Sequence, residues 1–401
     1  MIKRFCRPIV HMSTWETGLA IFSMFFGAGN VVFPLIMGRD SGDMIWMGVL
    51  GLILTAVLGP LLGLYATILQ DGQAGKLFFK IGRIPGSVLM IIGLVMLGPF
   101  AIMPRCFTVA YGAITPYFPN LSLLTFTIIA GFATLACIFR REKVLAILGY
   151  VLSPLLVICL AYIIYKGLTT VGKVDPHINA TALKAFKLGF DGGYYTLDLM
   201  CSIFYCAATW ALLNFQKEEA NKQGREYSVV LTCFWASIIS VVLLAIIYTG
   251  LAFSAANHNA SLVGVPRQQI LIHLSFIILH AKLALVSNVA IALACFTTAL
   301  GAGVTFADII CDEFKRSDMF KHIEIPYFPM CCGVVLVTVV LANLGFEGLM
   351  RFIEPIVQLI YPSVIVLAFA TMIEKVFKVN IIKVAVLITF IATIFIYMLT
   401  K

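Results

Sequence analysis

Long runs of apolar residues, separated by short polar segments, repeat along the whole chain. A helix needs about 20 predominantly apolar residues to cross the hydrocarbon core of a bilayer. By that measure the pattern predicts eleven membrane spans, near residues 15–37, 44–69, 86–111, 121–139, 143–165, 190–213, 227–253, 281–309, 325–343, 349–373 and 380–399. We therefore expect an all-α protein that crosses a membrane many times.

The composition supports this interpretation. Of the 401 residues, 61% are hydrophobic and only 12% are charged, whereas about a quarter of a typical soluble chain is charged. The 11 cysteines lie mostly in apolar segments and form no C-x-x-C pair, which favours packing over a disulfide framework or a metal site. A soluble multidomain protein is excluded.

The basic residues alternate between the two sides of the predicted membrane. Six groups of three, in the N-terminal tail and the even-numbered loops, hold 18 of the 28 lysines and arginines. Because cytoplasmic loops carry such an excess, we predict a cytoplasmic N-terminus and, after eleven spans, a C-terminus on the other side. The same small groups account for the net charge of +9 without nucleic-acid binding. No signal peptide is expected, because the first apolar segment is too long.

The centre of the first span departs from the apolar pattern. The stretch FSMFFGAGNVVFP (22–34) places Gly27, Ala28, Gly29 and Asn30 in the middle of the span. Glycine and asparagine are poor helix formers, and the bilayer core disfavours unpaired backbone groups. The pattern predicts a helix interrupted at the midplane, where free carbonyls and amides bind a ligand. Close packing through small residues is the alternative, but it does not explain Asn30.

A second weak point falls five spans later. In span six, FDGGYYTLDLMCSIF places Gly192, Gly193, Thr196 and Asp198 within an apolar helix. Weakened helices at corresponding positions of two halves are typical of transporters built from inverted repeats. Five is an odd number, so the second set of five spans runs through the membrane in the opposite sense. The expected domains are a transporter core and one additional C-terminal transmembrane helix, at 1–373 (repeats at about 15–165 and 190–373) and 374–401.

Span eight contains two adjacent hydroxyls, in LACFTTALGAGVTFAD. Thr297 and Thr298 are about 100° apart around a helix, so both can face one neighbouring site. With carbonyls of an interrupted helix, they would suit a hard cation such as Na⁺. The alternative is that each threonine donates to the carbonyl one turn earlier, as is common in membrane helices.

Charged side chains within the predicted spans are candidates for function. A carboxylate near the bilayer centre costs about 2.5–3.5 kcal/mol on insertion scales, so Asp198 is expected to face a substrate ammonium, a cation or a transported proton. Arg105, toward the outer end of span three, is a candidate outer-gate partner for Glu354 of span ten. Two simpler interpretations stay open: Arg105 reaches the outer interface, and Glu354 pairs with Arg351.

Together these segments resemble the branched-chain amino acid:cation symporter family, the BrnQ-type carriers. The resemblance is carried by FSMFFGAGNVVFP in span one, GPFAIMPR and FTV in span three, SPLLVICLAYIIYKGL in span five, GYYTLD in span six, LACFTTALG in span eight and YPSVIVL in span ten. It implies a LeuT-type fold of two inverted repeats with discontinuous first and sixth helices. It also implies a bacterial inner (cell) membrane location and uptake of leucine, isoleucine and valine with Na⁺ or, in some members, H⁺.

The resemblance also implies site residues. Backbone amides of Gly27, Ala28 and Gly29 would bind the substrate carboxylate, and Tyr195 would line the pocket. One cation site would comprise the carbonyls of Ser23, Phe26 and Ala294 with the hydroxyls of Thr297 and Thr298. Asn30 and Thr196 match positions that can form a second cation site beside that carboxylate.

Two features depart from the family pattern. Family members usually have about twelve spans, and here the eleventh predicted span ends near Lys401. Leu199, Met200 and Cys201 follow Asp198, where the family usually has small residues. If Met200 faces the pocket, methionine becomes a candidate substrate beside the branched-chain amino acids.

Three other functions would place different demands on the sequence than Na⁺-coupled import does. A proton-coupled carrier of the same or related apolar amino acids would use Asp198 to carry the proton and leave the threonine pair structural. An enzyme is disfavoured, because the six histidines form no H-x-x-x-H or H-E-x-x-H pattern. A channel is disfavoured, because selectivity filters generally use repeated rings. The expected partners are the amino acid and the lipid bilayer, with no cofactor beyond Na⁺ as coupling ion; the oligomeric state is not predicted.

Overall fold

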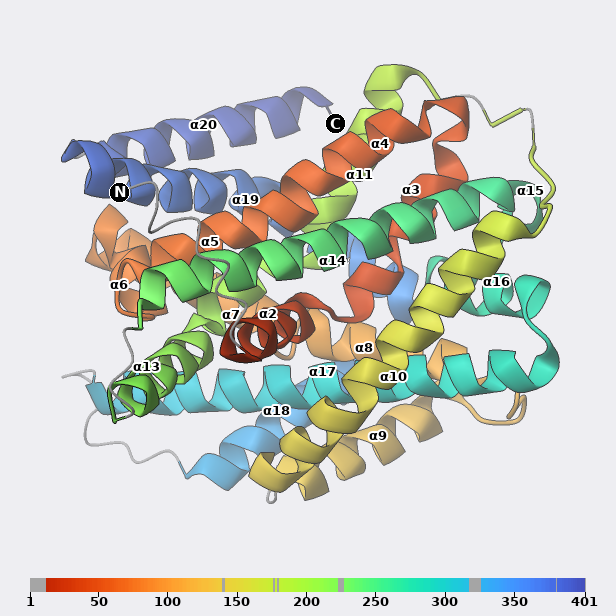
Figure 1. The fold of residues 1–401 in the computed structure, drawn as a ribbon, viewed down its shortest axis with the longest axis horizontal. Helices are drawn as coiled ribbons and strands as arrows, with labels where there is room; N and C mark the ends of the chain where they lie inside the picture. Colours follow the sequence, from red (N-terminus) through yellow and green to blue (C-terminus); the bar gives the residue numbers. More distant parts are fainter. Residues whose placement is uncertain are drawn as a thin grey trace.

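The protein is almost entirely helical. The computed structural model describes residues 12–138, 141–175, 177–178, 180–222, 227–316, 326–379 and 381–400, and no strand occurs within these ranges. Several of the longer helices, among them α14 (Val229–Asn257), α17 (Ala281–Arg316) and α19 (Gly345–Phe377), run roughly along the long axis of the molecule, and α10 (Arg141–Thr169) crosses it obliquely (Figure 1). The prediction of an all-α membrane protein is confirmed. The N-terminal tail (1–11), which contributed to the predicted orientation, lies outside the described residues.

The elements follow one another in the order of the predicted spans. The α-helices are α2 (Met12–Phe25), α3 (Phe33–Asp40), α4 (Ile45–Leu52), α5 (Leu58–Ile68), α6 (Ala74–Phe78), α7 (Arg83–Leu97), α8 (Ile102–Ile114), α9 (Leu123–Ile138), α10 (Arg141–Thr169), α11 (Ala182–Thr196), α12 (Asp198–Phe204), α13 (Cys206–Lys222), α14 (Val229–Asn257), α15 (Asn259–Leu262), α16 (Ile270–Ile278), α17 (Ala281–Arg316), α18 (Tyr327–Ala342), α19 (Gly345–Phe377) and α20 (Ile382–Thr400). Five short turns of tighter or wider helix complete the set: η1 (Ala28–Val31), η2 (Gly42–Met44), η3 (Ile53–Val57), η4 (Phe79–Ile81) and η5 (Arg267–Gln269).

The helices account for the predicted spans in three ways. Six helices of the described chain are long and apolar enough to cross a membrane, and two bent pairs raise the number to eight. Shorter apolar helices at Leu123–Ile138, Leu155–Thr169 and Tyr327–Ala342 lie where spans four, five and nine are predicted. The total of eleven and the limits of the two repeats stay predictions.

The first span is interrupted where the glycine-rich stretch predicts. Helix α2 ends at Phe25, the single turn η1 follows, and α3 begins at Phe33. The two halves are bent by 79° relative to each other. The discontinuous first helix is therefore confirmed.

The sixth span is also interrupted, within the stretch that the sequence singled out. Gly192 and Gly193 lie inside α11, which continues to Thr196. The interruption is at Leu197, whose φ is +66°, and α12 begins at the next residue. A further bend of 42° separates α12 from α13. The sixth helix is discontinuous, but the glycine pair is not its break.

Close helix packing explains the second glycine of that pair. A Cβ on Gly193 would lie 1.9 Å from Oγ1 of Thr55 and 2.8 Å from the amide nitrogen of Ala56. Only glycine allows α11 to approach the helix of span two this closely. At Gly192 the nearest atom would be 3.7 Å away, which is ordinary contact.

Span three lies within Arg83–Ile114, which is long and apolar enough to cross a membrane, and it contains a turn that the apolar pattern does not reveal. Helix α7 ends at Leu97 and α8 begins at Ile102, with a turn between them. A Cβ on Gly98 in this turn would lie 2.7 Å from the ring of Phe306, so glycine lets α17 pass close by. Helix α8, which follows this turn, carries Arg105.

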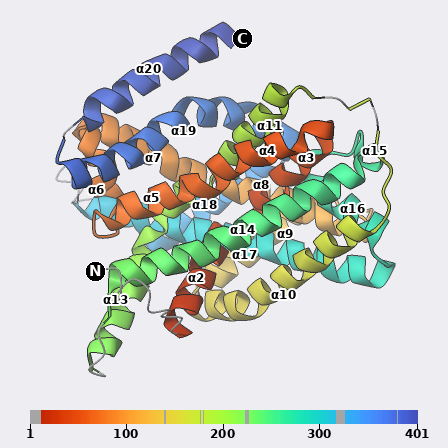
Figure 2. The same cartoon turned by 45° about the horizontal axis from the view of Figure 1, so that its top comes forward.

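Contacts between loops agree with the predicted grouping into two sides. Lys80 of the second loop pairs with Glu374, next to the tenth loop. On the opposite side, Arg39 after span one donates to the carbonyl of Val265 at 3.1 Å. Helix α20 lies at the edge of the bundle beside α19 in both views (Figures 1 and 2), with most of its surface exposed.

Candidate functional site

The side chain of Asn30 satisfies the backbone at the break in span one. In a continuous helix the Gly27 amide would donate to the carbonyl of Ser23. Here it donates to Oδ1 of Asn30 at 3.0 Å, and Nδ2 of Asn30 donates to the Phe25 carbonyl at 3.1 Å. Asn30 is 1% exposed. Because unpaired backbone groups are costly inside a membrane, one amide side chain makes the interruption tolerable.

The redirected hydrogen bonds leave other backbone groups available. Within the described residues, no donor reaches the carbonyls of Ser23 and Phe26, and the Gly29 amide has no acceptor. The Ser23 hydroxyl itself donates to the Ala20 carbonyl at 2.9 Å. The break therefore offers two carbonyl oxygens that a regular helix would have used.

Helix α17 runs directly beside this break. A Cβ on Gly27 would lie 3.1 Å from Cγ2 of Thr298, so glycine allows the close approach. The hydroxyls of Thr297 and Thr298 both donate to the carbonyl of Ala294, at 2.8 and 2.9 Å. This is the back-bonded alternative that the sequence left open, and it gathers three oxygens on one turn.

A small pocket lies between the break, α10 and α17. The centre of a water molecule has about 10 Å³ of free space there, which is room for about one water. Its lining residues are Phe26, Gly27, Ala28, Val31, Leu156, Ile291, Ala294 and Cys295.

Asp198 joins three spans through one carboxylate oxygen. Its Oδ2 accepts from Nδ2 of Asn30 at 2.8 Å and from the hydroxyl of Tyr248 at 2.9 Å. Asn30 and Tyr248 also contact each other. Asp198 is 1% exposed, and no basic nitrogen of a described residue lies within 4.0 Å of its carboxylate. A buried carboxylate is costly inside a membrane, so Asp198 was expected to face a partner. It does so, and the partners that donate to it here are uncharged.

Sequence reasoning missed Tyr248, on α14. Tyrosine in a membrane helix usually lies near the interface, and a buried hydroxyl needs a hydrogen-bond partner. Tyr248, in LLAIIYTGLAF, lies five residues before the end of predicted span seven and is completely buried. The sequence pattern does not distinguish it from an interfacial tyrosine.

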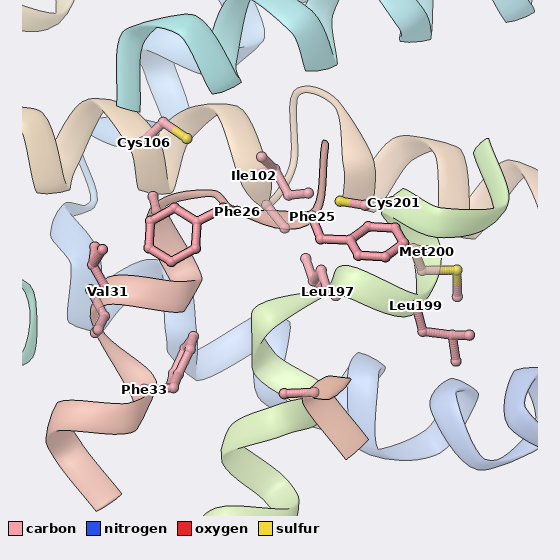
Figure 3. Close-up of a cluster of buried hydrophobic side chains, with 14 of the residues drawn as sticks. Phe25, Phe26, Val31, Phe33, Ile102, Cys106, Leu197, Leu199, Met200 and Cys201 are labelled. Atoms are coloured by element: carbon pink, nitrogen blue, oxygen red, sulfur yellow. The ribbon is translucent and has the colours of Figure 1, made fainter. Parts of the chain in front are cut away.

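The two breaks pack against each other. A Cβ on Gly29 would lie 3.0 Å from the Cα of Thr196. The Thr196 hydroxyl donates to the Gly193 carbonyl at 2.9 Å, so this side chain is used within its own helix. Figure 3 shows apolar residues of both breaks, among them Phe26, Phe33 and Leu197, in one cluster with Ile102 and Cys106 of α8. The second cation site at Asn30 and Thr196 stays a prediction.

Arg105 points into the protein and does not reach the interface. It is 2% exposed, and Nη1 donates to the carbonyl of Tyr195 at 2.5 Å. Its Nε donates to the carbonyl of Ala101 at 3.3 Å, and its guanidinium carbon lies 5.9 Å from the centre of the Phe33 ring. The interpretation of Arg105 as an interfacial residue was wrong.

The expected pairing of Arg105 with Glu354 is not made in this structure. Oε1 of Glu354 accepts from Nη1 of Arg267 at 2.6 Å, and Glu347 lies 3.3 Å from the same arginine. The local pair with Arg351 is not formed either among the described residues. Arg267 comes from the loop before α16, which the sequence did not place beside span ten.

Tyr195 links span six to span ten. Its hydroxyl accepts from Nε2 of Gln358 at 2.5 Å, one helical turn after Glu354. Its ring lies 5.6 Å from that of Phe33.

Met200 faces a second small pocket rather than the one beside α17. A Cβ on Gly93 would lie 3.1 Å from its sulfur. The lining is formed by Ile92, Gly93, Met96, Leu197, Met200, Ile356, Val357, Ile360 and Tyr361. The structure gives Met200 no contact with the threonine pair.

Comparison with known proteins places these features in a family. The sequence model of the family described as "Branched-chain amino acid transport protein" matches residues 10–400. Two similar proteins of Bacillus subtilis are the branched-chain amino acid permease BraB, 29% identical over 90% of this chain and 80% of its own, and the branched-chain amino acid permease BrnQ, 28% identical over 90% and 81%.

Solved structures of low sequence identity share the fold. The inward-facing conformation of Mhp1 is 12% identical, with a TM-score of 0.59 over 88% of this chain and 75% of that one. The substrate-bound outward-open state of a Na⁺-coupled sialic acid symporter is 10% identical, with a TM-score of 0.57 over 95% and 89%. The implied LeuT-type transporter fold is confirmed, and the chain is a transport protein rather than an enzyme. It belongs to the branched-chain amino acid transport protein family.

Proposed function

We propose that the protein imports leucine, isoleucine and valine together with Na⁺, by alternating access across a bacterial cell membrane. The family and its bacterial relatives support the substrate class. The observation that carries Na⁺ coupling is the set of oxygens where α2 ends beside α17. In this proposal the N-terminus is cytoplasmic.

The oxygens have the chemistry that a hard cation requires. Two carbonyls, of Ser23 and Phe26, have lost their helical donors because Asn30 redirects the backbone hydrogen bonds. Thr297 and Thr298 keep their lone pairs while donating to Ala294. Na⁺ would compete with the two hydroxyl protons for the Ala294 carbonyl. Its binding would therefore rotate both hydroxyls so that their oxygen lone pairs face the ion.

One Na⁺ for each amino acid is energetically sufficient. A tenfold gradient contributes about 1.4 kcal/mol. Moving one charge through 100 mV adds about 2.3 kcal/mol. The sum of about 3.7 kcal/mol would concentrate a zwitterion several-hundred-fold.

The test is uptake of labelled leucine into proteoliposomes that contain the purified protein. An imposed Na⁺ gradient should drive accumulation, and a proton gradient alone should not. Thr297→Ala with Thr298→Ala should raise the Na⁺ concentration needed for half-maximal uptake and leave the pH dependence unchanged. Thr371→Ala is the matched control, because Thr371 makes the same bond to the carbonyl one turn earlier, at 2.8 Å, but in α19.

Asp198 favours a second candidate, a proton-coupled carrier of the same or related apolar amino acids such as methionine. Its carboxylate is buried without a basic partner among the described residues and accepts from two neutral donors. In this case Asp198→Asn should abolish gradient-driven uptake and spare exchange of leucine. Accumulation with protons alone would replace the Na⁺ proposal, and unlabelled methionine as competitor would test the wider substrate range.

A further inference from the structure

We propose that Arg105 binds the α-carboxylate of the transported amino acid, while Asp198 faces its ammonium group. This inference rests on the proposed transport of amino acids and names the charges that recognise them. Four observations support this role of Arg105: its burial, its unused hydrogen-bond donors, its position at the two breaks and the separate acidic group nearby.

The first two observations concern the guanidinium itself. Arg105 is 2% exposed, and no carboxylate of a described residue lies within 4.0 Å of it. An arginine has five N–H donors, and the recorded bonds use Nη1 and Nε, so Nη2 has no acceptor in the described part of the chain. A buried charge without a counter-ion is costly, and a full negative charge would offset that cost.

The bond to Tyr195 compensates only part of that charge. The Tyr195 carbonyl is at the end of α11, where helix carbonyls carry a partial negative charge. Such a carbonyl orients the guanidinium and does not neutralise it. The forked geometry of arginine leaves the other side of the group free to pair with a carboxylate.

The third observation is where the guanidinium lies. It is bonded to one break, through Tyr195, and it lies over the ring of Phe33, which follows the other. Ile102 and Cys106, on the same helix as Arg105, belong to one cluster of buried side chains with Phe26 and Phe33 (Figure 3). The stretch from Gly27 to Gly29, whose Gly29 amide has no acceptor among the described residues, is therefore beside α8.

The fourth observation is the acidic group across the second break. Asp198 is three residues after Tyr195, so their Cα atoms are at most about 11 Å apart. The bonds from Asn30 and Tyr248 both go to Oδ2 of Asp198, and these donors carry no charge. Two buried charges of opposite sign thus lie at the second break, Arg105 bonded to the Tyr195 carbonyl and Asp198 at the start of α12, and they form no ion pair with each other.

An α-amino acid suits this arrangement better than other small solutes. Its ammonium and carboxylate are attached to the same carbon, so one molecule can pair with both charges. A carboxylic acid without an amine, or an amine without a carboxylate, would leave one protein charge buried and unpaired. The ligand class is therefore an α-amino acid zwitterion.

The test measures inhibition of labelled leucine counterflow in proteoliposomes, with no imposed gradient. The competitors are L-leucine and L-leucinamide, which lacks the carboxylate charge. In the wild type leucinamide should be the weaker competitor by about a hundredfold. In Arg105→Gln the affinity for leucine should fall by about a hundredfold, and that for leucinamide should change less than threefold. Arg39→Gln, which removes an arginine at the outer end of α3, is the control and should preserve the ratio.

Arg105→Lys keeps the proposal testable if the glutamine variant does not fold. Lysine retains the charge and loses the fork, so the preference for leucine over leucinamide should shrink to about tenfold. Equal weakening of leucine and leucinamide in either variant would show that Arg105 only supports the helix end. Absence of leucine counterflow in the wild type would instead overturn the proposed function itself.

Discussion

The two interrupted helices reach a similar shape by different means. In span one, glycines permit the irregular backbone and Asn30 bonds the groups on both sides of it. In span six, the break is one leucine with a positive φ, followed at once by α12. The first break carries its hydrogen-bond partners in its own sequence, whereas the second depends on neighbours such as Arg105 and Gly29.

This difference separates local from imposed irregularity. An L-residue in the left-handed region costs about 1–2 kcal/mol, so Leu197 would not choose that conformation alone. Leu197 is 1% exposed, and its packing between α7 and α19 accompanies the strained backbone. Three comparisons of variants would test this contrast, from the largest expected effect to the smallest.

Asn30→Ala should have the largest effect. It leaves the Gly27 amide and the Phe25 carbonyl unpaired, and each buried group without a partner costs about 1–3 kcal/mol. The thermal midpoint of the detergent-solubilised protein should fall strongly, and leucine transport should be lost. Asn288→Ala is the control, because Asn288 is also buried and its hydrogen bonds within the described ranges go to the side chains of Ser275 and Tyr117. Equal destabilisation by both variants would argue against a special role of Asn30 at the break.

The adjacent glycines of α11 should respond in opposite ways. Gly193→Ala inserts a Cβ into the contact with Thr55, and overpacking of this kind costs about 1–3 kcal/mol. Gly192→Ala meets nothing closer than 3.7 Å and should stabilise the helix by up to about 1 kcal/mol. The measurement is the thermal midpoint of each variant, which should fall for Gly193→Ala and rise slightly for Gly192→Ala. Equal lowering of the midpoint by both variants would show that close packing does not distinguish the two glycines.

The smallest effect is expected from comparing two variants at Leu197. Both Leu197→Gly and Leu197→Ala lose the buried side chain, but only glycine relieves the positive φ. The glycine variant should therefore be more stable than the alanine variant by about 1 kcal/mol. At Cys201, inside α12, the usual order should hold, with alanine above glycine. The usual order at Leu197 would mean that its backbone is not strained in the membrane.

The features predicted well were those encoded by a few neighbouring residues. The interruption at Gly27–Asn30 could be read locally, as could the alternative in which Thr297 and Thr298 donate to a carbonyl one turn earlier. The partners of Arg105 and Glu354 could not, because a charge pairs with whatever a distant segment brings near it. Arg267 lies 87 residues before Glu354, and Tyr195 lies 90 after Arg105.

By itself, the amino-acid sequence determines that the protein lies in a membrane, which family it belongs to and where the first span is interrupted. Hydrophobic length and unfavourable helix residues act through local free energies, which need no knowledge of neighbours. The tertiary structure decides that Leu197 rather than the glycine pair interrupts span six, that Arg105 turns inward and that Tyr248 completes the bonds of Asp198. These outcomes depend on packing and on buried hydrogen bonds between helices, which exist only once the helices are assembled.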